Sequence, residues 1–257
     1  MRAIKFLVIG ESCLDVFVYG SVERLAPEAP IPVFNQVTIE TNPGMASNVL
    51  ENLQALGCDA ELYTNRNWHS IKKTRYVEAK SNHMLLRIDQ GEGLYGNCDV
   101  TKIPFDEFDC VVISDYNKGW LTPKQINYIG KCSKMSVLDT KKILGPWASS
   151  MTFIKINESE YERTLSVLTD EIISKLIVTL GPDGAMYQNQ TFSCPDVARV
   201  DSCGAGDTFV AAFAKHFTEH GDAKGAKNVK FRSSPTKDAT PAQEAHMAAR
   251  ARVAALI

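Results

Sequence analysis

The stretch from Val200 to Phe217 reads V-D-S-C-G-A-G-D-T-F-V-A-A-F-A-K-H-F and changes character halfway along. Three small residues, Gly204, Ala205 and Gly206, precede Asp207, and an apolar pattern with helical spacing follows. The pattern predicts a helix that begins at the small residues. Unpaired N–H groups at a helix start bind anions, and a nearby carboxylate can accept a proton. The stretch therefore indicates either a phosphoryl-transfer site or an ordinary helix start with an acidic first turn.

Short apolar segments and helical patterns alternate along much of the chain. Strand-like segments are predicted at residues 4–9, 110–114, 136–140, 152–157 and 175–181. This alternation is typical of parallel strands joined by crossover helices, so we expect an α/β fold with a mainly parallel central sheet flanked by helices. Ligands of such sheets bind beyond the carboxyl ends of the strands, which singles out Asp115, Asp139, Asn157 and Gly181.

Two helices have boundary signals in the sequence. Residues 43–57 carry apolar residues on one helical face and end at Gly57. A second helix is predicted after Thr122, which is expected as its N-cap. Pro123 would occupy the first helical position and Gln125 would complete a capping box.

Two segments interrupt the alternation of strands and helices. Residues 16–39 contain prolines and two strand-like pieces, and residues 72–90 resemble a second pair of strands. We expect these segments to form a small β-sheet lid beside the main sheet. Because exposed strand edges and apolar sheet faces tend to be paired or covered, we also expect a homodimer through this lid.

Charge and cysteine content restrict the class of protein. The 28 basic and 30 acidic residues leave a net charge of −2, which gives no field for holding nucleic acid or an anionic membrane. The seven cysteines are scattered without a C-x-x-C pair, which favours reduced thiols, and the five histidines lack metal-ligand spacing. We expect one soluble, cytoplasmic domain over residues 1–257 without nucleic-acid or membrane partners, ending in an atypical polar tail over residues 222–257.

The segment D-S-C-G-A-G-D-T-F at residues 201–209 resembles the signature of the ribokinase-like (PfkB) carbohydrate kinases. Further motifs of that family follow its order: G-E-S-C-L-D at 10–15, N-P-G-M-A-S-N at 42–48, N-E-S-E at 157–160 and V-T-L-G-P-D-G-A at 178–185. The resemblance implies a ribokinase-like fold and an enzyme that uses ATP and Mg²⁺ to phosphorylate a sugar hydroxyl.

Two other segments are similar to one subgroup, the kinase half of the bacterial heptose enzymes. They are R-L-A-P-E-A-P-I-P-V at residues 24–33 and S-D-Y-N-K-G-W-L-T at 114–122. This similarity implies D-glycero-D-manno-heptose 7-phosphate as the substrate, with phosphorylation at O1. A kinase for another sugar, sugar phosphate or nucleoside remains an alternative, and so does a sugar-phosphate-binding protein without turnover.

The resemblance also implies roles for individual residues. Asp207 would be the general base, with Gly204, Ala205 and Gly206 as the anion hole. The substrate would be bound by Asp15, Gly44 and Asn48 at its hydroxyls and by Arg75 and Arg87 at its phosphate. The nucleotide side would consist of Thr179, Gly181 and Gly184 at the ATP phosphates, with Asn157 and Glu160 ordering Mg²⁺ through water. The alternatives are a strand-end turn for Asp15 and solvent-facing positions for Asn48 and the two arginines.

The sequence departs from the family pattern in three places. Met45 stands where the family has the second glycine of a Gly-Gly pair, which would crowd the sugar pocket. The segment between Gly57 and Thr74 is shorter than in the heptose kinases. Beyond about residue 220, the alanine-rich helices that form the family's adenine pocket do not align.

Overall fold

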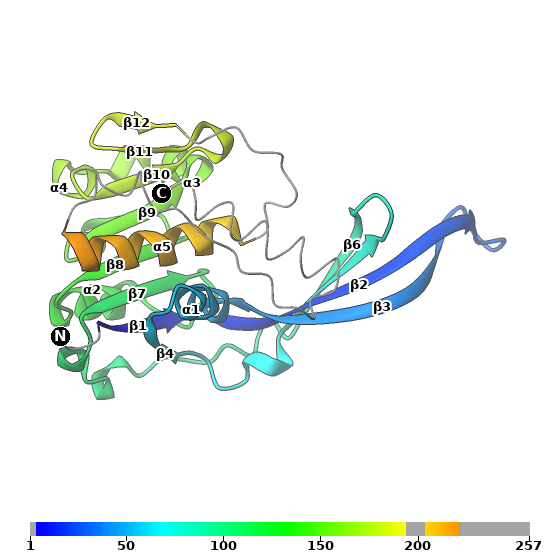
Figure 1. The fold of residues 1–257 in the computed structure, drawn as a ribbon, viewed down its shortest axis with the longest axis horizontal. Coiled ribbons are helices and arrows are strands. Elements are labelled where there is room, and N and C mark those ends of the chain that lie inside the picture. Colours follow the sequence, from blue (N-terminus) through cyan, green and yellow to red (C-terminus); the bar gives the residue numbers. More distant parts are fainter. Residues whose placement is uncertain (1–3, 194–203, 222–257) are drawn as a thin grey trace.

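The computed structural model describes residues 4–193 and 204–221 and contains two β-sheets (Figure 1). The strands of the larger sheet are β1 (Lys5–Gly10), β4 (Asp59–Tyr63), β7 (Cys110–Asp115), β8 (Ser136–Thr140), β9 (Phe153–Asn157), β10 (Leu176–Thr179), β11 (Ala185–Tyr187) and β12 (Gln190–Phe192). Their spatial order is β12-β11-β10-β9-β8-β7-β1-β4. From β10 to β4 all neighbours are parallel, and β11 and β12 add an antiparallel edge. The expected mainly parallel sheet is confirmed.

Helices cover both faces of this sheet (Figure 1). They are α1 (Ala46–Ala55), α2 (Pro123–Cys132), α3 (Glu158–Thr164), α4 (Asp170–Ile173) and α5 (Ala205–His220), with short 3₁₀ turns at Trp68–Ser70, Val100–Lys102, Phe105–Glu107, Pro146–Ala148, Leu165–Val167 and Gly181–Asp183. The alternation of side chains along each strand decides which helix meets which residues. Phe6 and Val8 pack with α1 and α5, whereas Leu7 and Ile9 belong to the cluster under α2.

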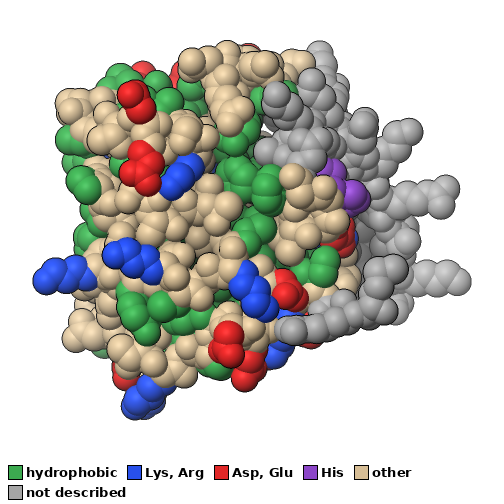
Figure 2. Space-filling model, turned by 90° about the vertical axis from the view of Figure 1, so that its left-hand side faces the viewer, with side chains coloured by type: hydrophobic (Ala, Val, Ile, Leu, Met, Phe, Trp, Pro, Cys, Tyr) green, Lys and Arg blue, Asp and Glu red, His purple; other side chains and the backbone are tan. Residues whose placement is uncertain are grey.

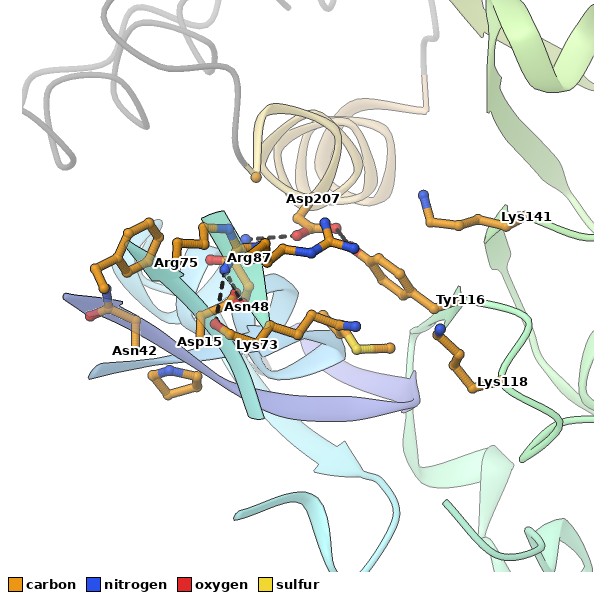
Figure 3. A pocket seen from close by; sticks show the side chains of 14 residues that line it. Asp15, Asn42, Asn48, Lys73, Arg75, Arg87, Tyr116, Lys118, Lys141 and Asp207 are labelled. Atoms are coloured by element: carbon orange, nitrogen blue, oxygen red, sulfur yellow. Dashed lines mark hydrogen bonds and ion pairs between the residues drawn. The ribbon is translucent and has the colours of Figure 1, made fainter. Parts of the chain in front are cut away.

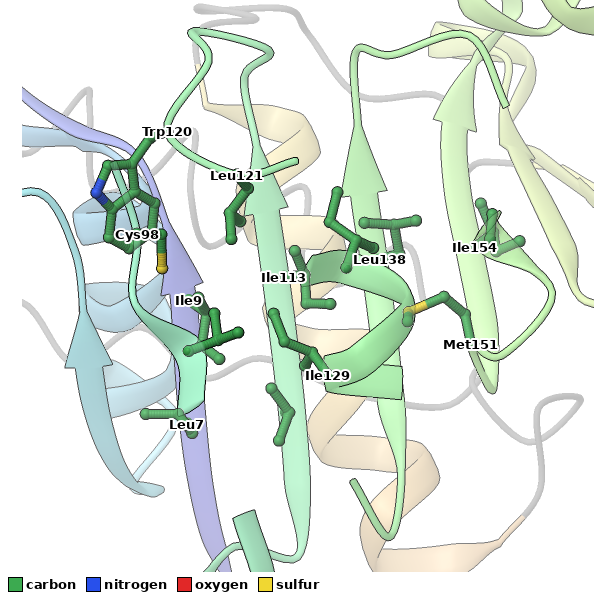
Figure 4. Close-up of a cluster of buried hydrophobic side chains, with 14 of the residues drawn as sticks. Leu7, Ile9, Cys98, Ile113, Trp120, Leu121, Ile129, Leu138, Met151 and Ile154 are labelled. Carbon is green, nitrogen blue, oxygen red and sulfur yellow. The ribbon is translucent and has the colours of Figure 1, made fainter. Parts of the chain in front are cut away.

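The cluster under α2 forms the larger part of the core (Figure 4). Ile129 of α2 lies against Ile113 and Leu138 of the central strands, and all three side chains are fully buried. On the other face of the sheet, the Phe153 ring stands edge-on to Phe213 of α5, with ring centroids 5.0 Å apart. These apolar contacts fix α5 over the middle of the sheet, so its first turn lies near the carboxyl ends of the strands.

The helix boundaries follow the sequence signals closely. Thr122 caps α2, because its hydroxyl accepts a hydrogen bond from the Gln125 N–H and the Gln125 side chain accepts one from the Thr122 N–H. α1 begins three residues later than the pattern suggested. Residues 43–45 belong to a strand instead, and Met45, with φ of 62°, turns the chain into the helix.

The second sheet contains the two segments that interrupt the alternation. Its strands are β2 (Ser12–Leu25), β3 (Pro32–Met45), β5 (Lys72–Glu78) and β6 (His83–Gln90), in the order β3-β2-β5-β6. β2 follows β1 almost directly, and the long β2–β3 hairpin extends away from the main body (Figure 1). Phe17 on β2 pairs in register with Arg75 on β5, which pairs with Arg87 on β6. These three side chains therefore share one face of the sheet.

The surface of the main body carries charged side chains and most of the described histidines. On the end of the molecule away from the hairpin, acidic and basic side chains are interspersed (Figure 2). His69, His83 and His220 are exposed, and His216 is half-buried. Among the described residues, no helix is long and apolar enough to cross a membrane, and no group of three or more histidine, cysteine, aspartate or glutamate side chains could hold a metal ion. The polar tail over residues 222–257 lies outside the described residues.

Candidate functional site

A cavity of about 380 Å³ lies between the second sheet and the loops at the carboxyl ends of β7 and β8 (Figure 3). The second sheet supplies one wall, α1 and the start of α5 supply the top, and the loops supply the other wall. The lining residues are Asp15, Phe17, Asn42, Pro43, Met45, Asn48, Lys73, Arg75, Arg87, Tyr116, Lys118, Lys141, Gly204 and Asp207. Six residues expected at the site from the sequence are among them: Asp15, Asn48, Arg75, Arg87, Gly204 and Asp207.

Asp207 is held in the first turn of α5 by two hydrogen bonds. The Asn48 side-chain amide donates to Oδ2 at 2.7 Å, and the Tyr116 hydroxyl donates to Oδ1 at 2.8 Å. The carboxylate is only 6% exposed. Burial raises the pKa of Asp207 to about 6, and the negative charge of Asp139 adds to this, while the hydrogen bond from Asn48 opposes it. A carboxylate with a pKa close to neutral pH is suited to accept a proton.

The small residues before Asp207 leave room for other side chains. Gly204 has φ of 76°, and a Cβ there would lie 2.8 Å from Asn48 Nδ2. A Cβ at Gly206 would lie 2.9 Å from the ammonium nitrogen of Lys155. Ala205 is the first residue of α5 and carries only a methyl group. These residues therefore let a side-chain amide and an ammonium approach the helix start, in addition to leaving its N–H groups open.

Asn48 is placed by a network between the two helices on that face. The Asn52 side-chain amide donates to the Asn48 carbonyl at 2.7 Å, and the Thr208 hydroxyl donates to Asn52 Oδ1 at 3.1 Å. All of these residues are buried. Because the network joins α1 to α5, it fixes the amide of Asn48 against Asp207.

Asp15 and Arg75 form an ion pair within the cavity. Arg75 Nη1 lies 2.6 Å from Asp15 Oδ1, and both side chains are largely buried. Gly44 belongs to the neighbouring strand β3, and a Cβ there would lie 2.4 Å from Asp15 Oδ2. Glycine at this position therefore makes room for the carboxylate. Arg87 is more exposed and pairs with Asp89 at 2.9 Å.

The cavity carries more positive than negative charge. Its charged lining consists of five cations, Lys73, Arg75, Arg87, Lys118 and Lys141, and two carboxylates, Asp15 and Asp207. Glu92 lies beside the cavity and bridges two of the lysines, at 2.9 Å from Lys73 and 2.5 Å from Lys118. These cations can bind an anionic ligand at the cavity.

Asn157 and Glu160 cap the start of α3. The Asn157 side chain accepts from the Glu160 N–H at 2.8 Å, and Glu160 Oε2 accepts from the Asn157 N–H at 2.8 Å. Glu160 Oε1 lies 3.7 Å from the Lys141 ammonium, and Glu160 is buried. The oxygen donors suit Mg²⁺, and Oε1, which takes no part in the capping box, has capacity for a bridging water.

Thr179, Gly181 and Gly184 lie at the end of β10 and in the turn that follows it. The Thr179 hydroxyl donates to the Ile156 carbonyl at 3.4 Å. Gly181 and Gly184 have φ of 60° and 97°, which is why glycine is favoured at both positions. Neither this turn nor the Asn157–Glu160 pair lines the cavity. The structure thus separates the expected nucleotide-side residues from the substrate-side residues.

Sequence reasoning missed several residues of the site. Tyr116, Lys118 and Lys141 follow the carboxyl ends of β7 and β8, the edge where ligands of parallel sheets bind. Their place directly after a buried strand was the available signal. Lys73 stands two residues before Arg75, and the period of two along a strand puts both on one face. Met45 lines the cavity as expected and is 4% exposed.

Comparison with known proteins agrees with this geometry. The profile of the pfkB family carbohydrate kinases matches residues 140–229, which include Asp207 and the capping box of α3. This part of the chain is similar to the PfkB carbohydrate kinases. A curated relative, the bifunctional protein HldE of Helicobacter pylori strain HPAG1, is 28% identical over 279 residues, covering 86% of this chain and 60% of the relative. The chain therefore spans somewhat more than half the length of that relative.

Solved structures share the fold of this chain. The nucleoside kinase of Methanocaldococcus jannaschii, an archaeal member of the ribokinase family, aligns with a TM-score of 0.62 at 17% identity, covering 86% of this chain and 87% of that one. The ribokinase of Arabidopsis thaliana, complexed with ribose and ATP, aligns with a TM-score of 0.61 at 17% identity, covering 87% and 89%. The expected ribokinase-like fold is confirmed.

Proposed function

We propose that this protein transfers the γ-phosphoryl group of ATP to a hydroxyl group of a phosphorylated sugar. The observation that carries the proposal is the position of Asp207. Its buried carboxylate lies in the first turn of α5, directly after Gly204 and Gly206 in the sequence, and faces a cavity with five cations. Phosphoryl transfer to a hydroxyl requires a base that lies close to groups able to bind the phosphate, such as the N–H groups at a helix start. The similarity to the PfkB carbohydrate kinases and the ribokinase-like fold support this reaction class.

The proposed chemistry uses two parts of the site, the Asp207 carboxylate and the N–H groups at the start of α5. Asp207 accepts the proton of the sugar hydroxyl as that oxygen attacks the γ-phosphorus atom. The N–H groups at the start of α5, around Gly204, Ala205 and Gly206, receive the negative charge on the transferring phosphoryl oxygens. Asn48 and Tyr116 hold the carboxylate in place through their hydrogen bonds. Asp15 would orient the sugar through its hydroxyl groups.

The charge of the cavity supports an acceptor that already carries a phosphate. Arg75 and Arg87 come from the second sheet, and Lys118 and Lys141 come from the opposite wall. Each of these cations already pairs with a carboxylate, and a phosphate on the acceptor would give all four a further anionic partner at the cavity. We therefore propose D-glycero-D-manno-heptose 7-phosphate as the acceptor, phosphorylated at O1. The similarity of residues 24–33 and 114–122 to the heptose kinases and the similarity of the chain to HldE support this choice.

ATP and Mg²⁺ would lie on the side of α5 away from the second sheet. Thr179, Gly181 and Gly184 would line the nucleotide phosphates, and Asn157 and Glu160 would hold Mg²⁺ through water. Bound there, the ion would neutralise charge on the phosphate groups. Glu160 Oε1, the oxygen that faces Lys141, would accept hydrogen bonds from the water molecules around the ion.

We also propose that the protein is a homodimer through its second sheet. The face of this sheet away from the cavity is apolar: Ile39, Val18, Tyr76 and Leu86 lie in register across its four strands. Ile39 is 51% and Leu86 is 54% exposed. A second copy of the same sheet would cover these side chains, because a two-fold axis brings identical faces together.

One experiment tests the proposed reaction. The protein is incubated with ATP, Mg²⁺ and heptose 7-phosphate, and the products are identified by phosphorus NMR. A heptose 1,7-bisphosphate signal is expected. The Asp207→Asn variant keeps the size of the side chain but removes the proton acceptor, so turnover is expected to fall by ~10²–10⁴-fold while the sugar phosphate still binds. A protein that binds the sugar phosphate without any product would instead be a binding protein.

A further inference from the structure

A buried ion pair lies beneath the first turn of α5. Asp139 on β8 and Lys155 on β9 are partners in the parallel register, so their side chains project from the same face of the sheet. Lys155 Nζ lies 3.0 Å from Asp139 Oδ2, and the Lys155 side chain is 7% exposed. Val137 and Phe153 lie two positions earlier on these strands, on the same face of the sheet, and pack under α5. The pair therefore replaces apolar packing at the end of the strands, where the helix begins.

The position of Lys155 is unusual on electrostatic grounds. The start of a helix carries partial positive charge, so a cation there is unfavourable unless anions compensate for it. The Lys155 ammonium nevertheless occupies the space that a side chain at residue 206 would need. Asp139 supplies a compensating anion 3.0 Å away. The ion pair therefore lies directly beside the first turn of α5, which carries Asp207.

The groups around Asp207 come from four elements of the main body. They are Asn48 on α1, Tyr116 after β7, Asp139 on β8 and Lys155 on β9. The cations Lys73, Arg75, Arg87, Lys118 and Lys141 line the cavity that Asp207 faces. Asn48 and Tyr116 bind the carboxylate directly, whereas the ion pair contributes one charge of each sign from below the helix. Neither member of the pair lines the cavity.

We propose that Asp139 and Lys155 are positioning residues that together set the protonation of Asp207. Lys155 favours the ionised carboxylate, and Asp139 holds the ammonium in place while limiting its effect. The two residues thus act in opposite directions on one base, and the absence of a side chain at Gly206 leaves room for the ammonium. The inference deepens the proposed kinase function and rests on it for its biological meaning, but the electrostatic arrangement can be measured without turnover.

The test uses the full chain labelled with ¹³C at the aspartate carboxyl carbons. The Asp207 signal is assigned by its loss in Asp207→Asn, and its titration is followed by NMR in three further variants. Lys155→Met keeps a long side chain without charge, and the pKa of Asp207 is expected to rise by about one unit. Asp139→Asn removes the negative neighbour, so the pKa is expected to fall. Lys175→Met is the control, because it removes a lysine that pairs with Glu171 at the surface, and no shift is expected.

The opposite signs separate this role from a purely structural one. A pair that only stabilises the fold would lower the unfolding temperature in both variants and leave the titration of Asp207 unchanged or shift it in one direction. Either result would overturn the inference. Should Lys155→Met fail to fold, the fall expected in Asp139→Asn decides alone. Kinase activity is measured on the parent protein in parallel: opposite shifts without any parental activity would uphold the inference and contradict the proposed function.

Discussion

The Arg75 guanidinium lies 2.6 Å from the Asp15 carboxylate, on neighbouring strands of the second sheet. The same guanidinium lies over the Phe17 ring, 5.2 Å from its centroid. The Asp15 and Arg75 side chains both line the cavity, and contacts within the sheet fix their positions. The sheet therefore presents a carboxylate suited to hydroxyl groups next to a cation suited to phosphate. Such preorganisation lowers the cost of ordering the site when a sugar phosphate binds.

The first expected outcome concerns Arg75. Arg75→Ala removes the cation that would contact the phosphate of the acceptor, so binding of the phosphorylated sugar is expected to weaken by ~1.5–3 kcal/mol. The unphosphorylated sugar never made that contact and should be used about as poorly by the variant as by the parent. Steady-state kinetics with both sugars measure the difference. Lys72→Ala serves as control, because Lys72 lies on the same strand but outside the cavity.

Two outcomes of these kinetics would count against the proposals. Equal losses with both sugars would make Arg75 a structural residue that supports Asp15. A parent enzyme that prefers the unphosphorylated sugar would contradict a phosphorylated acceptor altogether.

The second expected outcome is a pH dependence set by Asp207. Burial raises the pKa of this carboxyl to about 6, and the base must be ionised to accept a proton. We therefore expect kcat/KM to fall as the pH decreases through about 6, with a slope of one proton. The control is a pH series with Asp207→Asn, whose residual activity should lack this limb. A limb near the ordinary aspartate value would contradict the raised pKa of Asp207, and a limb that persists in Asp207→Asn would show that another group acts as the base.

The same pKa has a consequence for stability. The folded-state pKa of Asp207 lies above its ordinary value of ~3.9, so protonation favours the native state. Asp207 therefore destabilises the fold increasingly as the pH rises from about 4 through about 6. Asp207→Asn carries no charge, so the difference in the free energy of unfolding between it and the parent should move in favour of the variant over that window. Denaturant unfolding at several pH values measures this difference.

The sequence predicted the fold and part of the site. Alternating strands and helices specify a parallel sheet, and Thr122 and Gln125 specify a helix start by side-chain chemistry alone. Contacts between distant elements are a different matter. The hydrogen bond from Tyr116 to Asp207 joins residues 91 positions apart and depends on how the loop after β7 meets the start of α5. No local pattern contains that information, which is why Tyr116 and Lys155 escaped the sequence reasoning.

Glycines illustrate the same limit. The sequence placed Gly204 and Gly206 at an anion-binding helix start, and the structure gives each a specific neighbour: Asn48 for the first and Lys155 for the second. A short side chain signals close approach, but the approaching group can only be read from the packed structure. The roles assigned to the nucleotide-side residues remain predictions.

The third expected outcome concerns Tyr116. Its hydroxyl donates to the Asp207 carboxylate at 2.8 Å and stabilises the ionised form. Tyr116→Phe removes only that oxygen, so the acid limb of kcat/KM should move to higher pH. A lost hydrogen bond to a charged group corresponds to a shift of about one pKa unit, so kcat/KM should fall about tenfold below pH 6 and about twofold at pH 7. Tyr128→Phe is the matched control, since Tyr128 is exposed on α2. An unchanged pH profile in Tyr116→Phe would show that the hydrogen bond does not control the base.

The last expected outcome tests the homodimer. Val37 and Ile39 on β3 are 74% and 51% exposed, and Leu86 on β6 is 54% exposed. A charge on this face would have to be buried without a partner in a dimer, so Ile39→Asp is expected to yield monomers. Light scattering at micromolar concentration should give twice the chain mass for the parent and the single mass for the variant. Ile143→Asp places the same charge on an equally exposed residue of the main body and should leave the dimer intact. A parent that scatters as a monomer would exclude the proposed assembly.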